Sequence, residues 1–500
     1  MKVAVAGSGI GGLITGLLLA KNGHKVTIFE KDEEIGGRLA FVTKGDYKID
    51  KGPTIVLLPD MLMSILSDAG VNTDEIELIR CDPLYGIHFP DGQTYRKFAD
   101  LETQLDEIRR EFPGDEKGFK RFMSDMDERF SIGEPQFLQS SFLGIKDYVN
   151  PKTIGSLIKL KAYRTVMSNL KTYFAHERLQ MSYGLQSLYI GGNPYSTPAI
   201  YSLVSFSEHK HGIYYIKGGY ASILEPIRKA CERLGVEIKT SCPVEKILVE
   251  DGKAEGIRSS EGDFMADAVV VNGDFPGTHS LMERPSDKKY TPSSGCVLFY
   301  MGVKGTYPDK DLHQFYLNEH FSKNMKEIFE KGKVPSEPSF YVFNPSIVDE
   351  SLAPEGNSVL YVLVPVPASE KIDWEDASGY LSSYVLDTME ESGFDDLRER
   401  LNWMETRTPE QARQEGLYAG GSFGIAPALG QSGPFRPQVQ PFPEKNVFAV
   451  GASTHPGGGV PIVMQGAKLV ELAVQRYVEE ELERKDVTMD EQDFGSVRSL

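Results

Sequence analysis

Three glycines near the start of the chain have a spacing that suits a phosphate-binding turn. Gly7, Gly9 and Gly12 follow the apolar residues 2–6 and precede a run suited to a helix, about residues 11–22. Such glycines permit a tight turn, close approach of the backbone to a pyrophosphate, and close packing of the helix on the strand. The positive end of the helix dipole would then face the phosphates. The predicted contacts in this turn also include Ile10 and Gly11.

A carboxylate follows at the distance that a nucleotide-binding turn requires. Glu30 lies 18 residues after Gly12, at the end of a second apolar strand over residues 25–30. A carboxylate at this place can accept hydrogen bonds from the ribose hydroxyls of an adenosine. Strand, turn, helix, strand and acid occur together, which makes the pattern far more specific than an isolated glycine motif. We include the adjacent Lys31 among the predicted cofactor contacts.

A second glycine pair favours FAD over a nicotinamide cofactor. The segment 36–38 (Gly-Gly-Arg) begins six residues after Glu30. Glycines let the chain lie against a cofactor, and a guanidinium can bind a pyrophosphate in a bidentate manner. A nicotinamide dehydrogenase has no need of this further loop. The predicted contacts here are Gly37 and Arg38.

Two further segments, 50–54 and 451–461, are predicted to face the flavin ring. The second follows an apolar strand over 446–450 and opens a helix. The N-terminus of that helix would face the flavin edge on which negative charge gathers during reduction. The predicted contacts from both segments are Pro53, Thr54, Gly451, Gly459 and Val460. His455 is a weak candidate for a catalytic base, and a packing role within the loop explains it at least as well.

Apolar periodicity predicts an α/β chain in which three distant segments build the cofactor domain. A β-α-β passage is predicted from strands 213–216 and 236–239 around a helix over 222–234, and three antiparallel strands follow at 244–249, 254–258 and 264–271. Further strands are predicted at 296–303, 339–343 and 358–366. The predicted boundaries are 1–75, 211–285 and 419–483 for the FAD-binding domain, 76–210 for a mainly helical part facing substrate and membrane, 286–418 for a substrate domain and 484–500 for a disordered tail.

Composition excludes several classes of partner and site. The net charge of −18 argues against nucleic acid, because binding phosphate backbones needs a basic surface. The four cysteines are scattered, which excludes a disulfide scaffold and fits a reducing cytoplasm. His209 and His211 would share one face of a strand, but no acid completes a ligand set, so we predict no metal. Glycines interrupt the apolar N-terminus, and no run of 18 apolar residues occurs, so neither a signal peptide nor a membrane span is expected.

Together these segments resemble those of bacterial carotenoid desaturases of the phytoene desaturase group, within the wider amine-oxidase-like flavoproteins. The resemblance runs from the start to about residue 480. It is carried by residues 3–38 with Glu30, 50–60, 215–219 and 451–463. The stretch 421–432, with Arg436 and Pro437, is most similar to desaturases that act on dehydrosqualene (4,4'-diapophytoene).

The resemblance implies a Rossmann-type FAD-binding domain, an α+β substrate domain and a helical part that faces the membrane. It also implies that the backbone of Val244 contacts the adenine region. The implied reaction is desaturation of a linear C30 precursor, 4,4'-diapophytoene to 4,4'-diaponeurosporene, with hydride passing to flavin N5. No second strand–glycine–helix unit is found in the sequence, which favours the polyene itself as the electron donor. No side chain is assigned as the base, and the oligomeric state stays open.

Three alternatives remain open at this point. One is oxidation of a terminal methyl group of a carotenoid to an aldehyde. A more distant one is a non-enzymatic lipid-escort protein of the same fold, and a third is a soluble amine oxidase. The nucleotide motifs are shared by the enzymes among them, so the substrate pocket must distinguish the reactions.

A hydrophobic polyene substrate predicts contact with a membrane surface, at the inner face of the cell membrane and from the cytoplasm. Residues 151–176 contain five cations and no acid, in a chain that is otherwise acidic. Each cation contributes about 1 kcal/mol at most to binding anionic lipid. A solvated basic helix explains the segment equally well. The cations are Lys152, Lys159, Lys161, Arg164 and Lys171.

Overall fold

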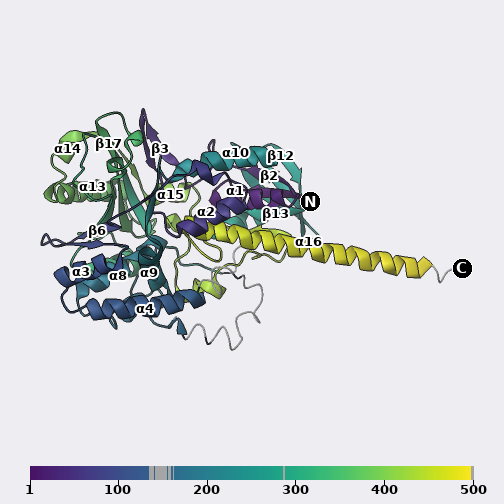
Figure 1. Cartoon of the computed structure of the whole chain (residues 1–500). Helices are drawn as coiled ribbons and strands as arrows, with labels where there is room; N and C mark the ends of the chain where they lie inside the picture. The colour runs from purple at the N-terminus through teal and green to yellow at the C-terminus, as the bar shows by residue number, and fades with distance from the viewer. Residues whose placement is uncertain (134–139, 141–154, 156–158, 162, 285–287, 497–500) are drawn as a thin grey trace.

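The chain forms two lobes, seen side by side in Figure 1. The structure, a computed structural model, describes residues 1–133, 140, 155, 159–161, 163–284 and 288–496. One lobe holds β1 (Lys2–Ala6) and β2 (Lys25–Phe29), and the other holds the long strands β14 (Gly295–Lys304) and β17 (Asn357–Val366) above a layer of helices. The last helix, α16 (Val460–Ser496), runs along the first lobe and projects beyond it (Figure 1).

A five-stranded parallel sheet forms the centre of the first lobe. Its order is β19-β13-β1-β2-β9, with β9 (Glu237–Lys239), β13 (Ala268–Val271) and β19 (Val447–Ala449). Its strands therefore come from residues 1–75, 211–285 and 419–483. Val3 and Val5 of β1 pack under α1 (Ile10–Lys21), α10 (Leu224–Leu234) and α16, while Ala4 and Ala6 face the opposite side. Both faces are covered, as is usual for a parallel sheet.

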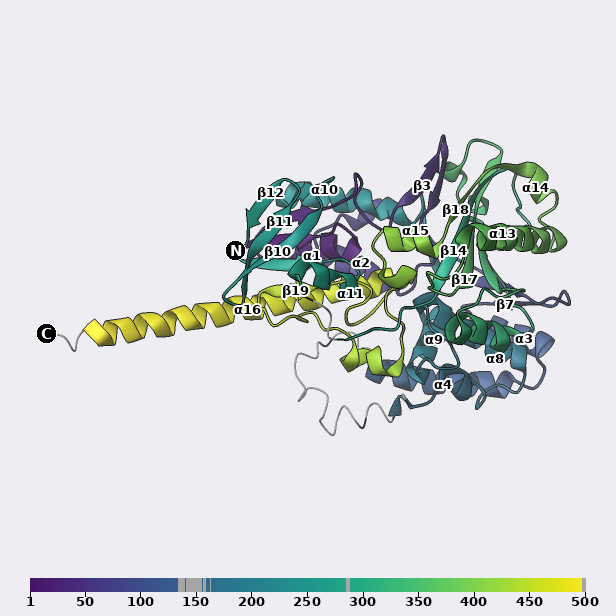
Figure 2. The ribbon, with the colours of Figure 1, turned by 180° about the vertical axis from the view of Figure 1, so that it is seen from behind.

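An antiparallel meander covers the second face of this sheet. It consists of β10 (Val244–Glu250), β11 (Lys253–Ser259) and β12 (Gly262–Met265), at the same end of the molecule as α1 (Figure 2). The prediction of a single third strand over 264–271 is wrong, because β12 ends at Met265 and β13 begins a different sheet. All four residues of β13 are buried, as expected of a central parallel strand, and a continuous apolar run does not reveal this change of partner.

The predicted strand, helix and strand around residues 213–239 are all present, but the two strands belong to different sheets. The strand β8 (Tyr214–Ile216) pairs antiparallel with β5 (Leu78–Arg80), whereas β9 joins the parallel sheet beside β2. Gly218 and Gly219 both have positive φ values and turn the chain after β8. Glycine adopts such values without strain, so the turn is a property of these residues. The partner of β8, however, depends on a segment far away in the sequence.

A seven-stranded sheet forms the core of the second lobe, in the order β18-β14-β17-β16-β15-β6-β7. Successive residues of β14 point to opposite faces. Val297 and Phe299 pack under α13 (Trp374–Glu391), while Leu298 and Tyr300 face the helical layer. The remaining strands are β6 (Tyr85–His88), β7 (Thr94–Lys97), β15 (His313–Tyr316), β16 (Phe340–Phe343) and β18 (Leu401–Arg407).

The helical layer lies between residues 101 and 211 and follows three short strands that the sequence did not predict, β5, β6 and β7. Its elements are α3 (Leu101–Glu111), α4 (Glu116–Gly133), α7 (Val166–Leu170), α8 (Glu177–Gly184), η3 (Leu185–Ile190), η4 (Ala199–Tyr201) and α9 (Ser202–His211). His209 and His211 therefore lie on a helix and not on a strand, because the segment 202–211 packs against α4. The residues that the structure describes contain no group of three possible metal ligands.

The remaining elements connect the lobes or close their edges. Residues 484–496, predicted as a disordered tail, continue α16, since no proline interrupts this stretch. Within the described ranges, no helix combines the length and the apolar character needed to cross a bilayer. The other elements are β3 (Phe41–Lys44), β4 (Tyr47–Asp50), α2 (Pro59–Asp68), η1 (Thr73–Glu75), η5 (Tyr220–Ile223), α11 (Phe275–Thr278), η6 (His279–Met282), α12 (Phe321–Lys326), η7 (Glu327–Lys331), η8 (Pro345–Ile347), η9 (Glu350–Leu352), α14 (Leu397–Arg400), α15 (Pro409–Gln414), η10 (Tyr418–Gly420), η11 (Leu429–Gln431) and η12 (Gly433–Phe435).

Candidate functional site

One continuous cavity of about 1270 Å³ connects the parallel sheet of the first lobe with the helical layer of the second. Pockets for a single small ligand usually measure roughly 300 to 1,000 Å³, so this space can hold two molecules side by side. The predicted site residues that line it are Gly7, Gly9, Ile10, Gly11, Glu30, Lys31, Gly37, Arg38, Pro53, Thr54, Val244, Gly451, His455, Gly459 and Val460. Direct binding of the cofactor by these residues stays a prediction.

Gly12 is the predicted contact that lies off the cavity, and its place in the fold explains why. A Cβ atom at Gly12 would come within 2.1 Å of the carbonyl oxygen of Gly7. The absence of a side chain therefore lets helix α1 pack closely against the turn that precedes it. This packing role is what the fold adds, and direct contact of Gly12 with the cofactor stays a prediction.

Glu30 holds the glycine turn in place with its carboxylate. Oε2 accepts a hydrogen bond of 2.8 Å from the backbone N–H of Ser8, and Oε1 accepts one of 3.1 Å from the N–H of Asp32. Glu30 is buried at the carboxyl end of β2, where parallel sheets place their ligands. The same carboxylate lines the cavity, so it can bind ribose hydroxyls from a fixed position.

Asn272 is a site residue that the sequence prediction missed. It follows β13 directly, and its Nδ2 donates to the carbonyl oxygens of Gly7 (3.1 Å) and Gly9 (3.2 Å). It also lines the cavity. A polar residue immediately after a buried apolar strand is the signal that could have found it, but only once residues 268–271 had been assigned to the parallel sheet.

The second glycine pair lies against the first turn. The backbone N–H of Gly36 donates to the carbonyl of Ser8 at 3.0 Å. Arg38 donates from Nη1 to the carbonyl of Ser422 at 2.8 Å. Burial lowers the pKa of the Arg38 guanidinium, while the nearby carboxylate of Asp274 counteracts this effect. Arg38 stays a cation beside the cavity, as binding a pyrophosphate requires.

A buried arginine, Arg436, fixes the loop at 451–460 through hydrogen bonds to backbone carbonyls. Arg436 is 5 % exposed, and its guanidinium donates to backbone carbonyls of Ile425, Gln431, Ala452 and Thr454. Burial lowers its pKa, and Tyr201 and Asp274 counteract this effect. The sequence prediction used Arg436 as part of the resemblance without giving it a role. Its partners lie 5 to 18 positions away along the chain, at residues 425, 431, 452 and 454.

His455 lies in this loop with a neutral imidazole. Burial lowers its pKa to about 4, against the opposing effect of hydrogen bonds to the backbone of Ser140 and Gly433. Nε2 lies 2.9 Å from the carbonyl oxygen of Ser140, so this nitrogen carries the proton and donates it. These contacts favour the packing role over that of a base.

A hydrogen-bonded pair joins the cofactor side of the cavity to the sheet of the second lobe. The Oγ1 atom of Thr54 lies 2.8 Å from the hydroxyl of Tyr341, which in turn lies 2.7 Å from Nδ1 of His313. Burial lowers the pKa of His313 to about 3, so this histidine is neutral. Thr54 and Tyr341 both line the cavity and mark the point where its two parts meet.

Beyond this point the cavity becomes a chamber with apolar and aromatic walls. The ring of Phe315 lies 5.0 Å from that of Tyr341 and 6.0 Å from that of Tyr189. Among the residues that the structure describes, those lining the cavity between 130 and 207 include no charged side chain. They are Phe130, Gly133, Tyr163, Leu185, Leu188, Tyr189, Ile190, Pro198, Ile200, Tyr201, Leu203, Val204 and Ser207.

The geometry of the first part fits FAD. The backbone of Gly9 and that of Gly37 face each other, and a Cβ at Gly37 would lie 3.6 Å from the Cα of Gly9. An acid for the ribose, a cation for the pyrophosphate and a helix N-terminus at Val460 follow one another along the same wall. The chamber then begins next to the predicted flavin position.

Sequence comparisons agree with this geometry. Residues 10–469 match the model of a family described as flavin containing amine oxidoreductase. A 4,4'-diapolycopen-4-al dehydrogenase of Metabacillus indicus is 51% identical over 476 residues, which cover 95% of this chain and 97% of that protein. A 4,4'-diapophytoene desaturase (4,4'-diaponeurosporene-forming) of Staphylococcus haemolyticus is 32% identical, with 96% and 99% covered. A zeta-carotene-forming phytoene desaturase of Myxococcus xanthus is 34% identical, with 94% and 93% covered.

Solved structures share the fold at low sequence identity. A putrescine oxidase variant superposes with a TM-score of 0.63 at 15% identity, covering 95% of this chain and 99% of that one. A Rab GDI of Plasmodium falciparum superposes with a TM-score of 0.55 at 13% identity, covering 95% and 97%. Both likenesses concern the fold alone.

Proposed function

Because this chain belongs to the flavin containing amine oxidoreductases, in their bacterial carotenoid desaturase group, and is an FAD-dependent oxidoreductase, we propose that it oxidises the terminal carbon of a linear C30 carotenoid. The feature that carries the proposal is the apolar chamber, which opens directly from the predicted flavin position. Its walls suit a long hydrocarbon chain. A cationic amine would find no carboxylate among the described lining residues from 130 to 207, which argues against amine oxidation.

The relatives favour the chain end over the chain interior as the reacting position. The Metabacillus indicus protein, at 51% identity, is named for an aldehyde at carbon 4 of a C30 chain. Proteins named as desaturases stand at 32% and 34%. Desaturation of 4,4'-diapophytoene to 4,4'-diaponeurosporene is therefore the second candidate, supported by a relative that matches almost the whole chain.

FAD, when bound, supplies the acceptor for two electrons in the form of a hydride. The residues of this chain bind and orient both partners. Glu30 and Arg38 would hold the adenosine and pyrophosphate end, and Arg436 fixes the loop at the flavin end. The chamber walls exclude water from the polyene. Oxidation of the terminal carbon takes each added oxygen from water and passes two electrons per step to the flavin, so water must reach the reacting end while the walls keep it from the rest of the polyene.

The test offers the FAD-loaded enzyme three C30 polyenes in lipid vesicles: one with methyl ends, one with a single terminal aldehyde, and 4,4'-diapophytoene. Products are separated by chromatography and identified by absorption spectrum and mass. We expect oxygenated, more polar products from the first two. Longer conjugation in the third, without any oxygenated product, would establish the second candidate and exclude the first.

His455→Ala tests the remaining candidate for a base in the same assay. We expect turnover within about threefold of the unaltered enzyme, since the contacts of His455 support the loop. A loss of about 100-fold or more with normal FAD content would assign it a role in proton transfer.

We propose that the chamber opens on a membrane surface, at the inner face of the cell membrane. Three large side chains line the cavity and are nevertheless exposed: Tyr163 (67 %), Leu429 (58 %) and Phe435 (60 %). Lys288 lies beside them and donates to the carbonyls of Gly430 and Phe435. An exposed apolar rim with adjacent cations is typical of a surface that docks on anionic lipid. Of the five predicted cations, Lys152 lies outside the described residues.

Vesicle flotation tests this docking. We expect the double variant Leu429→Ser, Phe435→Ser to lose most of its binding to anionic vesicles. Met265→Ser, a matched control, removes a side chain that is 55 % exposed on the meander and should float normally. Replacement of the five cations of 151–176 by glutamine tests the electrostatic part separately. Unchanged flotation of both sets would contradict membrane docking.

We also propose that residues 1–75, 211–285 and 419–483 act as one FAD-binding unit and residues 286–418 as the substrate unit. The pairing of strands from all three segments in one sheet supports the first part. The seven-stranded sheet supports the second, although it also recruits β6 and β7 from the segment before the helices.

A further inference from the structure

The cavity is lined by more cations than acids, although the chain as a whole has a net charge of −18. Among the described lining residues there are five cations and four carboxylates. The cations are Lys31, Arg38, Lys51, Arg407 and Arg436, and the carboxylates belong to Glu30, Asp32, Asp274 and Glu415. An excess of cations around a cavity in an acidic protein indicates an anionic ligand.

Arg407 is the only cation that residues 286–418 contribute to the described part of the cavity wall. It ends β18, the edge strand of the seven-stranded sheet. Opposed residues of antiparallel strands project to the same face of a sheet. A row of such residues crosses the sheet from Arg407 and lines the cavity throughout: Leu298, Leu363, Tyr341 and Phe315. At roughly 4.8 Å per strand, Arg407 lies about 14 Å from Tyr341 along this row.

The segment from Lys51 to Thr54, predicted to face the flavin ring, follows the same row. At one end, Nζ of Lys51 lies 3.2 Å from Oε1 of Glu415, the ion-pair partner of Arg407. At the other end, Oγ1 of Thr54 lies 2.8 Å from the hydroxyl of Tyr341. Arg407 therefore lies beside the start of this segment, and the aromatic wall of the chamber lies at its other end.

One edge of the Arg407 guanidinium is fixed and the other is free. Nε and Nη2 lie 3.2 and 2.6 Å from Oε2 of Glu415. Burial by itself lowers the pKa of Arg407, but the hydrogen bonds to Glu415 raise it above its usual value, so the group stays a cation. Within the described ranges, Nη1 has no hydrogen-bond partner, although Arg407 is only 9 % exposed and lines the cavity. This donor edge is available to a ligand inside the cavity.

Arg407 also lies near a second guanidinium, that of Arg38. Burial lowers the pKa of Arg38, the carboxylate of Asp274 counteracts this effect, and the charge of Arg407 lowers the pKa further. Two cations that are close enough to repel each other cost free energy unless an anion binds beside them. Glu415 does not fully balance Arg407, because the same carboxylate also pairs with Lys51.

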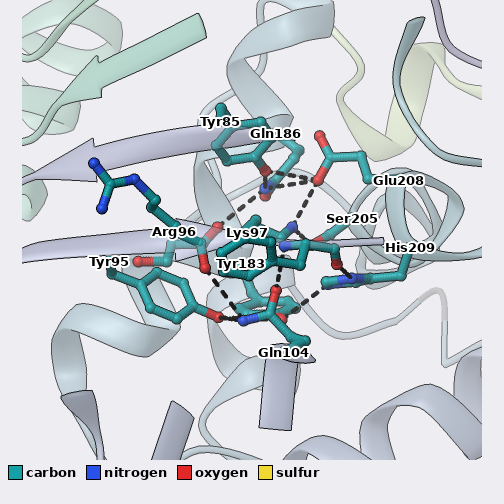
Figure 3. A network of polar contacts seen from close by, with 12 residues as sticks. Tyr85, Tyr95, Arg96, Lys97, Gln104, Tyr183, Gln186, Ser205, Glu208 and His209 are labelled. Carbon is teal, nitrogen blue, oxygen red and sulfur yellow. Dashed lines mark hydrogen bonds and ion pairs between the residues drawn. The ribbon is translucent and has the colours of Figure 1, made fainter. Parts of the chain in front are cut away.

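A second buried cation, Lys97, shows how a closed ion pair differs (Figure 3). Its ammonium group lies 2.6 Å from Oε2 of Glu208 and 3.2 Å from Oγ of Ser205. Both side chains of the pair are fully buried, and neither residue is among those that line the cavity. Figure 3 shows further polar side chains gathered around the pair. The charge of Lys97 is thus balanced within the core, whereas that of Arg407 reaches the cavity.

We propose that Arg407 is a cofactor-binding residue contributed by the second lobe. Its Nη1 edge binds a negatively charged oxygen of FAD, and Glu415 holds the guanidinium in place. Two parts of FAD supply such an oxygen: the diphosphate, and the flavin ring once it is reduced. The proposal concerns the cofactor and holds for either candidate carotenoid reaction. It makes FAD a bridge between the two lobes.

Two equilibrium measurements on the full chain test this contact without requiring turnover. The affinity for oxidised FAD is measured by flavin fluorescence, and the reduction potential of the bound flavin by titration against a reference dye. A diphosphate contact predicts that Arg407→Leu binds oxidised FAD at least about tenfold more weakly, with an unchanged potential. A contact with the reduced ring predicts a lower potential, by about 30 mV for each tenfold loss of affinity for reduced FAD.

Arg407→Lys keeps the charge and should recover at least about threefold of the loss, whichever part of FAD is bound. Glu415 keeps its contact with Lys51 in both variants, so the fold should be retained. An affinity and a potential of Arg407→Leu that both match those of the unaltered protein would overturn the proposal. A loss that Arg407→Lys does not reduce at all would assign the effect to packing and overturn it as well.

Arg413→Leu is the matched control. Arg413 lies on α15, is 43 % exposed, pairs with Glu370 at 3.0 Å and does not line this cavity. Its removal takes the same charge from the same part of the chain, so the affinity for FAD and the potential should stay the same. An effect as large as that of Arg407→Leu would show that net charge, and not contact, is responsible, and would overturn the proposal.

Discussion

The two parts of the cavity recognise their ligands by different means. At the nucleotide end, backbone groups of the glycine turns face the cavity, and Glu30 and Asn272 hold those turns by accepting from or donating to main-chain atoms. In the chamber, side chains from η3, α9, β15 and β16 form the wall, and their positions depend on packing between distant segments.

Because of this difference, the two parts of the cavity should respond differently to substitution. An added side chain at a glycine of the turn distorts the turn locally. It should have little effect on the free energy of unfolding of the whole chain. In the second lobe, Lys97 and Glu208 form a fully buried ion pair, with 2.6 Å between Nζ and Oε2. This pair contributes to the stability of the lobe, because an uncompensated charge in the core is costly. Substitutions in the two parts should therefore affect different measurements.

The largest effect is expected from Lys97→Met. It leaves Glu208 buried without its cation, so the free energy of unfolding should fall by about 3 to 5 kcal/mol. Chemical denaturation of the FAD-loaded protein measures the change. FAD affinity, measured by flavin fluorescence in the folded range, should stay the same, because the pair lies outside the nucleotide end.

A double variant sharpens this prediction. Lys97→Met with Glu208→Gln removes both charges and should recover most of the lost stability. If the double variant is as unstable as Lys97→Met alone, the loss comes from packing and not from the unpaired carboxylate.

The next effect concerns Asp50, the last residue of β4. Its carboxylate accepts hydrogen bonds of 2.9 Å from the backbone N–H groups of Tyr220 and Ala221, and burial raises its pKa to about 7. A raised pKa in the folded state stabilises the protein fully below the unfolded value near 3.8, and this stabilisation is lost as the pH rises through about 7.

Asp50→Asn removes this titration. Between pH 4.5 and 7.5 the free energy of unfolding of the unaltered protein should therefore fall relative to that of the variant, by about 3 kcal/mol. Denaturation at a series of pH values in the FAD-loaded state measures the difference. A difference that does not change with pH contradicts the raised pKa.

Gly12→Ala should act on cofactor binding. The new methyl group would meet the carbonyl oxygen of Gly7, so the turn must shift, at a cost of about 1 to 3 kcal/mol. We expect FAD affinity to fall by at least about tenfold, measured by equilibrium dialysis. Gly379→Ala on α13 is the control, since no atom lies within 4 Å of its Cβ position. Normal FAD affinity in Gly12→Ala would show that the turn adapts without loss.

The smallest effect is expected where the two parts meet. Thr54→Val removes one hydrogen bond to Tyr341, whose hydroxyl keeps its contact with His313. The free energy of unfolding should fall by about 1 kcal/mol, seen as a lower Tm. FAD content should be unchanged. A loss of FAD would show that Thr54 contacts the cofactor directly, as the sequence predicts.

The parts of the site that sequence reasoning predicted are those whose residues are close along the chain. The turn at Gly7, Glu30 and the segment around Arg38 belong to one β-α-β unit, whose spacing follows from helix and strand geometry. The helix after Gly451 is likewise a local pattern. Their common position along one cavity is what the structure adds.

The residues that sequence reasoning missed act across long separations. Asn272 binds a turn more than 260 positions earlier, and Lys97 finds its partner 111 positions later. A lysine in a short alternating strand reads as a solvent-facing residue, because charged side chains are rarely fully buried. The buried position of Lys97 follows from the strand pairing of the second lobe, which no local pattern records.

The position of α16 in the fold has a consequence for the timing of assembly. Helix α1 packs against α16, and β19 completes the edge of the parallel sheet, yet α1 ends at Lys21 and α16 begins at Val460. A ribosome adding about 5 to 20 residues per second needs roughly 20 to 90 seconds to synthesise the intervening chain. During that time the glycine turn has emerged while the loop that closes the flavin end has not. We therefore expect stable binding of FAD only after synthesis of the polypeptide is complete. A nascent chain stalled before residue 447 should not retain the cofactor.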